Sequence, residues 1–255
     1  MISLKTESWD ISNIETVLFD KDGTFIDLHY FWGKMTEMRA KEIIKRYGLD
    51  INLFEKICLF LGYDPKSSKM LSDGITALYS RSKIIEIFRE KLVEIGVSVS
   101  VCELEKIFDF VSCEFYKEIE KYTKPIDSAI RFINDLYLNG VKLGVVTSDS
   151  VKSTILTLKQ YGWEKYFDVV IGRESSPCTK ESGEPTKLAL QKLNAKPETA
   201  VMIGDAPMDY LSAKNAGINN VILVSTGQIE KEVLMQTSPF SVEDLEEIII
   251  QKTYS

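Results

Sequence analysis

The sequence predicts an α/β fold: a parallel sheet covered by helices on both faces, with a separate helical domain inserted after the first strand. Short apolar runs alternate with helical-period segments in the second half of the chain, which is typical of parallel sheets. The first and second apolar runs are separated by residues 28–140, far more than one crossover helix requires. We therefore expect two domains rather than one.

Five apolar runs bounded by polar residues predict the strands of the sheet. They lie at residues 16–19, 141–146, 168–171, 200–203 and 220–224. Apolar residues spaced by three and four predict helices between and after the later strands. These helical segments are 126–138, 151–161, 185–193, 210–216 and 242–250.

The inserted part has helical periodicity almost throughout. Helices are predicted at 34–47, 53–61, 80–95 and 101–120, separated by turns that contain glycine or proline. We therefore assign residues 28–119 to an all-helical cap domain. Residues 1–27 and 120–255 form the predicted sheet domain.

The composition narrows the range of partners and compartments. The chain has 255 residues, 44% of them hydrophobic, and a net charge of −7 without a long Lys/Arg cluster. A nucleic-acid partner is not expected, because phosphate backbones require a basic surface. No segment is apolar enough for a signal peptide or a membrane span, and the four cysteines have no disulfide or zinc spacing. These features predict a cytoplasmic protein. They do not set its oligomeric state, for which either a monomer or a dimer is expected.

The first strand ends in an unusual way. The sequence T16-V-L-F-D20-K-D22-G-T-F-I-D27 places two aspartates one residue apart, directly before Gly23. Alternation along an extended chain sends Asp20 and Asp22 to the same side. Two like charges about 4 Å apart cost on the order of 4 kcal/mol at an effective dielectric constant of about 20. Such a pair requires a compensating charge.

Polar side chains also follow the other predicted strands, at the sheet edge where ligands bind in parallel α/β folds. They are Thr147, Ser148 and Asp149 after the second strand, Lys180 after the third, and Asp205 and Asp209 after the fourth. Carboxylates from separate segments suit Mg²⁺, which prefers oxygen ligands. A lysine and a hydroxyl would hold a phosphate, and Gly23 would let backbone amides approach it. An aspartate can then attack phosphorus while a second carboxyl moves protons.

These segments resemble the four ordered motifs of the haloacid dehalogenase superfamily, which has a Rossmann-like core. F-D-K-D-G-T is similar to the D-x-D-G-T signature, which implies that Asp20 is the nucleophile and Asp22 the general acid and base. V-V-T-S-D resembles the second motif, so that Thr147 and the amide of Ser148 would contact the phosphoryl group. G-D-A-P-M-D resembles the fourth motif. By this resemblance Asp205 binds Mg²⁺ with Asp20 and the backbone carbonyl of Asp22, and Asp209 supports the site.

The third motif departs from the family pattern. Relatives often have K-P-x-P-E-P, whereas this chain has Lys180-Glu-Ser-Gly-Glu-Pro185. The resemblance assigns Lys180 as the phosphate-binding lysine, with Lys187 as the alternative. Glu181 and Gly183 replace the two prolines, so a less rigid loop is expected.

The resemblance implies a Mg²⁺-dependent phosphatase of the phosphoglycolate phosphatase type, with a C1-type helical cap and a small phosphorylated metabolite as substrate. Asp22 argues against carbon–halogen cleavage, which has no leaving oxygen to protonate. A sugar phosphomutase and a non-catalytic binding module on the same fold remain alternatives. Two local roles are also open. Asp149 is expected to cap the helix near residue 151, and His29, the single histidine, is either a hinge residue or part of the site.

Overall fold

A computed structural model of the chain describes residues 1–252. It divides the chain into two compact units, Met1–Asp27 with Pro125–Ser255, and Leu28–Lys124. The second boundary therefore lies at residues 124/125 rather than at 119/120. The short helix α6 (Ile119–Tyr122) belongs to the inserted unit, because Tyr122 stacks on Phe115 of that unit with ring centroids 4.8 Å apart.

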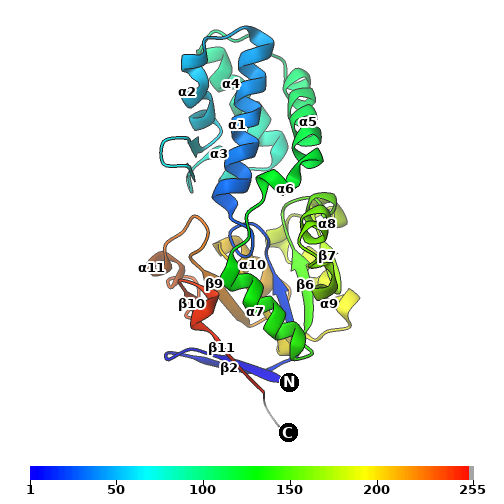
Figure 1. Cartoon of the computed structure of the whole chain (residues 1–255). Coiled ribbons are helices and arrows are strands. Elements are labelled where there is room, and N and C mark those ends of the chain that lie inside the picture. Colours follow the sequence, from blue (N-terminus) through cyan, green and yellow to red (C-terminus); the bar gives the residue numbers. More distant parts are fainter. Residues whose placement is uncertain (253–255) are drawn as a thin grey trace. The chain divides into compact units, whose positions relative to one another are not determined.

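The sheet of the first unit has six parallel strands in the order β10-β9-β8-β3-β6-β7. Figure 1 labels β6, β7, β9 and β10 of this sheet. Their bounds are β3 Thr16–Phe19, β6 Lys142–Val146, β7 Val169–Ile171, β8 Ala200–Gly204, β9 Asn220–Val224 and β10 Ser241–Val242. All five predicted strands are present, and β10 adds a sixth. The first strand of this sheet, β3, is central, with β6 on one side and β8 on the other. The parallel α/β prediction is confirmed.

Helices connect the strands as predicted. They are α7 Asp127–Leu138, α8 Val151–Gln160, α9 Glu184–Leu193 and α10 Pro207–Asn215. The short helix α11 (Lys231–Leu234) was not predicted. Helices α9 and α10 share one buried apolar cluster with the sheet, in which Leu190 and Ala213 pack with Leu18 and Met202. All four residues of β3 are buried, because helices cover both of its faces. Short 3₁₀ turns occur at Glu164–Tyr166, Arg173–Ser175, Lys180–Ser182, Pro197–Thr199 and Leu245–Glu247.

The prediction of a helix at 242–250 is wrong. Asp244 caps only a single 3₁₀ turn, and the chain then enters strand β11 (Ile249–Lys252). This strand pairs antiparallel with β1 (Ile2–Lys5), which also pairs with β2 (Asp10–Ile14). The backbone partners of β11 lie at the opposite end of the sequence, so local periodicity could not reveal this three-stranded sheet.

The inserted unit is helical apart from one short hairpin, which the all-helical prediction did not include. Its helices are α1 Leu28–Tyr47, α2 Phe54–Phe60, α3 Ile75–Leu78, α4 Arg81–Glu94, α5 Val101–Lys117 and α6, with a 3₁₀ turn at Ile51–Leu53. Strands β4 (Tyr63–Asp64) and β5 (Lys69–Met70) form the hairpin. Four buried phenylalanines, Phe31, Phe88, Phe108 and Phe115, form much of the core of this unit.

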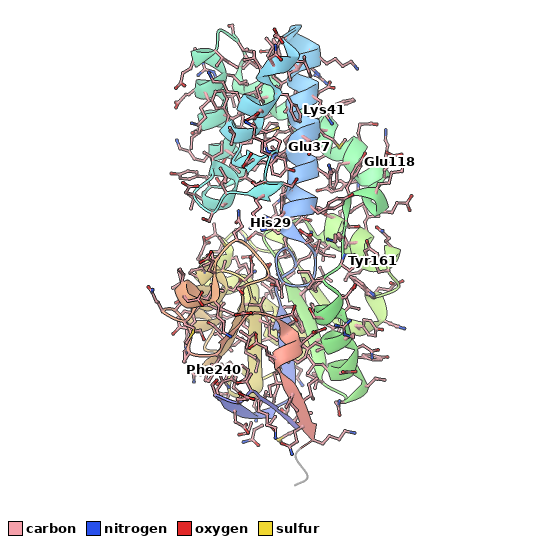
Figure 2. All side chains as sticks on the ribbon, turned by 60° about the vertical axis from the view of Figure 1, so that its left-hand side comes forward. His29, Glu37, Lys41, Glu118, Tyr161 and Phe240 are labelled. Atoms are coloured by element: carbon pink, nitrogen blue, oxygen red, sulfur yellow. The ribbon has the colours of Figure 1, made fainter. Side chains whose placement is uncertain are left out.

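Helix α1 carries His29, Glu37 and Lys41 (Figure 2). The Nδ1 atom of His29 accepts a hydrogen bond of 3.0 Å from the backbone N–H of Met70. His29 thus ties α1 to the hairpin within this unit, which favours a structural role. None of the helices within residues 1–252 is long and apolar enough to cross a membrane.

Candidate active site

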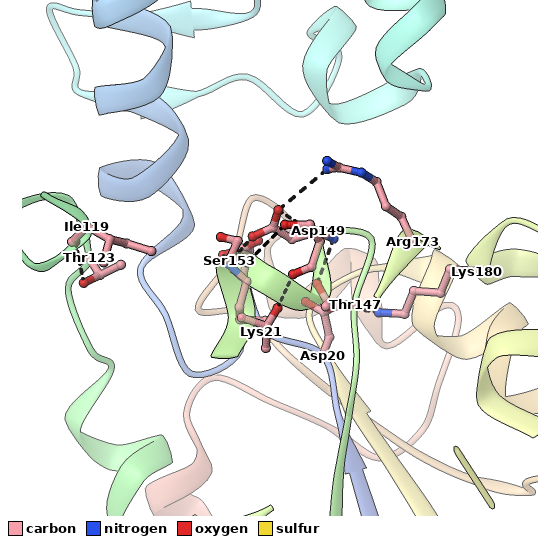
Figure 3. Close-up of polar contacts among 12 residues, drawn as sticks. Asp20, Lys21, Ile119, Thr123, Thr147, Asp149, Ser153, Arg173 and Lys180 are labelled. Carbon is pink, nitrogen blue, oxygen red and sulfur yellow. Dashed lines mark hydrogen bonds and ion pairs between the residues drawn. The ribbon is translucent and has the colours of Figure 1, made fainter. Parts of the chain in front are cut away.

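The carboxyl ends of three neighbouring strands bring the candidate residues together. Asp20 directly follows strand β3, Thr147 follows β6 and Asp205 follows β8, and β3 is parallel to both of its neighbours. Backbone hydrogen bonds between the strands continue to Asp20 and Thr147, since the Asp20 N–H donates to Ile203 O and the Thr147 N–H donates to Ile171 O. Figure 3 shows Asp20, Thr147 and Lys180 grouped here, with Lys21 and Asp149 beside them. The edge is the ligand-binding side of a parallel sheet.

The loop after β3 is tightly wound. The backbone carbonyl of Lys21 accepts hydrogen bonds from three N–H groups, those of residues 24, 25 and 26. Gly23 has φ = 89°, a conformation that favours glycine, and a Cβ there would collide with the carboxylate of Asp205. The hydroxyl of Thr226 donates to the Gly23 carbonyl at 2.6 Å. The loop is therefore held by its own backbone and by the segment after β9.

Lys180 reaches the first aspartate. Its side chain is buried, and its Nζ lies 2.5 Å from Asp20 Oδ1 and 2.6 Å from Asp209 Oδ1. Lys187, the alternative, is half-exposed and pairs with Glu184 on the surface of α9. The geometry therefore favours Lys180 over Lys187 for contact with a ligand at Asp20.

The loop that carries Lys180 is fixed without the two prolines. Asn215, at the end of α10, donates its side-chain amide to Glu181 O at 2.7 Å. Gly183 has φ = 80° and packs so closely that a Cβ would lie 2.6 Å from the backbone of Asn215. These two contacts fix the loop against α10 without the prolines of K-P-x-P-E-P. The looser loop expected from the sequence stays a prediction.

Three buried carboxylates, those of Asp20, Asp205 and Asp209, have oxygen atoms within 4.8 Å of one another. Burial raises the pKa of Asp20 to about 7, with Lys180 opposing the shift and Asp209 and Asp22 adding to it. Burial, with repulsion from Asp20 and Asp209, raises the pKa of Asp205 well above its ordinary value. One lysine is insufficient to balance three carboxylates. The possible ligand atoms are carboxylate oxygens, which Mg²⁺ prefers, and the group carries excess negative charge. The group therefore fits a magnesium ion.

Asp209 has two roles in this group. Its Oδ2 accepts the backbone N–H groups of Asp205 and Ala206 at 3.1 Å each, which caps the start of α10. Its Oδ1 pairs with Lys180. Capping and support of the charged group are therefore combined in one side chain.

Thr147 and Ser148 lie at the end of β6. Thr147 is buried, and its hydroxyl oxygen accepts the Asp149 N–H at 3.0 Å. Ser148 is exposed, and its hydroxyl lies 3.6 Å from the sulfur of Met208. The cap of α8 is Ser150, whose hydroxyl accepts the Ser153 N–H, so the capping role expected for Asp149 is wrong.

Asp149 instead pairs with Lys21, to which none of the four motifs assigns a role. The Nζ of Lys21 lies 2.8 Å from Asp149 Oδ2 and 2.8 Å from Asp22 Oδ1. Burial alone would lower the pKa of Lys21, but Asp149 and Asp22 raise it above its ordinary value. Each aspartate of the first motif thus has its own buried ammonium group: Lys180 for Asp20 and Lys21 for Asp22. The unusual position of Lys21, between two aspartates at the end of an apolar strand, was the available signal.

The fold and the site together define a class of protein. A Rossmann-like core places an aspartate pair, a hydroxyl, a lysine and a third and fourth aspartate on one sheet edge, in the chain order of the four motifs. Residues 14–217 match the family model of the haloacid dehalogenase-like hydrolases. The chain belongs to this family, as the motifs indicated, and is a hydrolase of the phosphatase and phosphomutase type.

Its relatives in sequence include proteins named pyrophosphatase PpaX. It is 25% identical over 210 residues to the pyrophosphatase PpaX of Halalkalibacterium halodurans, an alignment that covers 82% of this chain and 83% of the relative. It is 33% identical over 131 residues to a protein provisionally named pyrophosphatase PpaX in Caldanaerobacter subterraneus subsp. tengcongensis, covering 51% of this chain and 59% of that one.

Solved structures share the fold at low sequence identity. A predicted phosphoglycolate phosphatase from Haemophilus somnus 129PT aligns with a TM-score of 0.68 at 16% identity, covering 92% of this chain and 96% of the other. A protein from Thermotoga maritima, provisionally described as a β-phosphoglucomutase, aligns with a TM-score of 0.66 at 20% identity and the same coverage. The Rossmann-like fold class is therefore confirmed.

Proposed function

We propose that the protein is a Mg²⁺-dependent phosphatase that hydrolyses a small phosphorylated metabolite through an aspartyl-phosphate. The observation that carries this proposal is the buried contact of Lys180 with both Asp20 and Asp209, beside Asp205. This arrangement joins a nucleophilic carboxylate, a cation for phosphate oxygens and an oxygen donor set for a metal. Such a combination serves phosphoryl transfer, which depends on positioning and on charge stabilisation.

The residues have distinct roles in this proposal. Asp20 attacks phosphorus, and Asp22 protonates the leaving oxygen and later accepts a proton from the attacking water. Lys180, the Thr147 hydroxyl and the Ser148 amide hold the phosphoryl oxygens. The phosphate-binding role predicted for Gly23 is not supported, because its N–H donates to Ile26 O and the absence of a side chain leaves room for the Asp205 carboxylate. Asp20, Asp205 and the backbone carbonyl of Asp22 would hold Mg²⁺, with Asp209 in support. The metal, when bound, neutralises the charge that develops on the phosphoryl group.

The substrate class is open within small phosphorylated compounds. The names of the sequence relatives support inorganic pyrophosphate as the first candidate, and the phosphoglycolate phosphatase type supports small acid phosphates. The inserted helical unit serves as the cap domain and provides the selectivity. This assignment rests on the position of the insertion directly after the Asp20 loop.

Phosphate release from a panel of substrates tests the activity. The panel contains inorganic pyrophosphate, phosphoglycolate, hexose phosphates and nucleoside monophosphates, each with Mg²⁺. We expect release from at least one of them at a kcat/KM of about 10⁴ M⁻¹s⁻¹ or more, the lower end of the usual range for enzymes. Isomerisation of a hexose phosphate without phosphate release would instead identify a phosphomutase.

Lys180 and Lys187 provide a matched pair of variants. Lys180→Ala is expected to reduce kcat/KM by about 10²- to 10³-fold, because it removes a preorganised charge at the phosphoryl group. Lys187→Ala removes a half-exposed surface lysine and is expected to leave kcat/KM within about twofold. Steady-state kinetics on the best substrate of the panel measures both. Equal losses in the two variants would contradict the assignment of Lys180.

A further inference from the structure

Lys21 is a buried charge that the proposed chemistry does not use. Its side chain has no exposed surface, although an ammonium group is costly to remove from water. The cost is offset by two carboxylates, each 2.8 Å from Nζ, one on Asp22 and one on Asp149. Since a neutral side chain would fill this space without such a cost, the charge itself requires an explanation.

Asp149, one of the two carboxylates that contact Lys21, is itself held in place. Asp149 is buried, and its Oδ1 accepts the Ser150 N–H at 2.7 Å, at the start of α8. Its Oδ2 contacts Lys21, and the guanidinium of Arg173 approaches its Oδ1 at 3.8 Å (Figure 3). A carboxylate fixed at the end of β6 therefore fixes the ammonium group that contacts Asp22 at the end of β3.

The three side chains differ in their exposure. Those of Lys21 and Asp149 are wholly buried, whereas that of Asp22 is 11% exposed. Asp22 is thus the member of this trio that solvent, and therefore a substrate, can reach. Lys21 itself is shielded from a bound ligand and acts only through Asp22.

We infer that Lys21, anchored by Asp149, is a positioning residue that holds the Asp22 carboxyl group at the place where it transfers the proton to the leaving oxygen. This inference rests on the proposed function. As the bond between phosphorus and the leaving oxygen breaks, that oxygen takes the proton of Asp22, and phosphorus becomes bonded to Asp20. Proton transfer requires heavy atoms about 2.6–3.2 Å apart, so small displacements of Asp22 slow this step.

The dependence of rate on the leaving group tests the inference. p-Nitrophenyl phosphate has a leaving group that departs without a proton, whereas glycerol phosphate has an alkoxide leaving group that requires one. We expect Lys21→Met to lower kcat/KM for glycerol phosphate by about 10²-fold or more. For p-nitrophenyl phosphate we expect a change within about fivefold. A purely structural defect would lower both values equally, and that result overturns the inference.

Two further variants separate a loss of positioning from a loss of stability. Lys21→Met combined with Asp149→Leu removes both buried charges, so it should regain thermal stability relative to Lys21→Met while keeping the selective loss. Recovery of glycerol phosphate hydrolysis in this double variant would overturn the inference. Lys165→Met, at an exposed lysine, is the control and should match the wild type for both substrates.

Asp22→Asn separates failure of the inference from failure of the proposed function. A selective loss with glycerol phosphate is expected for it as well, larger than that of Lys21→Met. If Asp22→Asn shows this selectivity and Lys21→Met does not, the positioning role is overturned and the proposed function stands. If Asp22→Asn shows no selectivity, the proton-transfer role of Asp22 is overturned, and the positioning role with it.

Discussion

Replacement of Asp20 with asparagine is expected to reduce phosphate release by about a thousandfold or more. The asparagine amide keeps the shape of the side chain but cannot form the acyl phosphate on which the proposed reaction depends. Steady-state kinetics on the best substrate measures the loss. Acid-quenched protein incubated with ³²P-labelled substrate should retain label in the wild type and none in Asp20→Asn. Unchanged turnover in Asp20→Asn would contradict the role of Asp20 as nucleophile.

The same variant is expected to fold at least as stably as the wild type in metal-free buffer. Burial raises the pKa of Asp20 to about 7 from 3.8, so the folded protein binds this proton more tightly than the unfolded chain does. The ionised carboxyl therefore lowers stability increasingly as the pH rises from about 4 to 7, and by a constant amount above that. Asparagine has no such penalty. Thermal melts of both proteins across this pH range should show a difference in Tm that grows in favour of Asp20→Asn.

Removal of divalent metal is expected to abolish activity, and addition of Mg²⁺ to restore it. The three carboxylates of Asp20, Asp205 and Asp209 lie within 4.8 Å of one another with Lys180 as the balancing charge, so the metal-free group is self-repelling. Turnover in excess EDTA should fall below about 1% of that with Mg²⁺, since the metal stabilises the charge on the phosphoryl group. Full activity in excess EDTA would contradict the metal site.

The thermal stability of the protein provides a second measurement of metal binding. Mg²⁺ at about 100 times its dissociation constant stabilises the folded state by about 2.7 kcal/mol, which raises the Tm. Asp205→Asn is expected to abolish most of this rise. Asp135→Asn, which makes the same change at an exposed carboxylate of α7, should show the full rise. A Tm that does not respond to Mg²⁺ in the wild type would be evidence against the site.

The sheet and most of its helices could be predicted because their signals are local. Each of the five predicted strands is a short apolar run. Those of β3 and β8 are wholly buried, whereas β7 at the sheet edge is partly buried. The helices between the strands have regular apolar spacing. The helix predicted at 242–250 failed for the opposite reason. Residues in this range divide between β10, a 3₁₀ turn and β11, and β11 pairs in a three-stranded sheet whose other strands begin at Ile2 and Asp10. Sequence spacing carries no information on that pairing.

The loop after β7, which carries Lys180, also depends on a contact between segments that are far apart in the sequence. Its sequence has Glu181 and Gly183 where relatives have proline, which predicted a loose loop and left Lys187 as an alternative to Lys180. The contact of Gly183 and Glu181 with Asn215, more than thirty positions away along the chain, holds the loop in place. Only the packing of η4 (Lys180–Ser182) against α10 brings these residues together.

The sequence by itself determined the chemistry available at the sheet edge. Strand ends recur at the same edge of a parallel sheet, so the order of Asp20, Thr147, Lys180 and Asp205 along the chain was sufficient to place them together. The tertiary structure decided how their charges are balanced. Lys180 pairs with Asp20, and Lys21 pairs with Asp22 and Asp149, because ion pairing depends on distances between segments that are remote in sequence. Such distances arise only when the strands are assembled side by side.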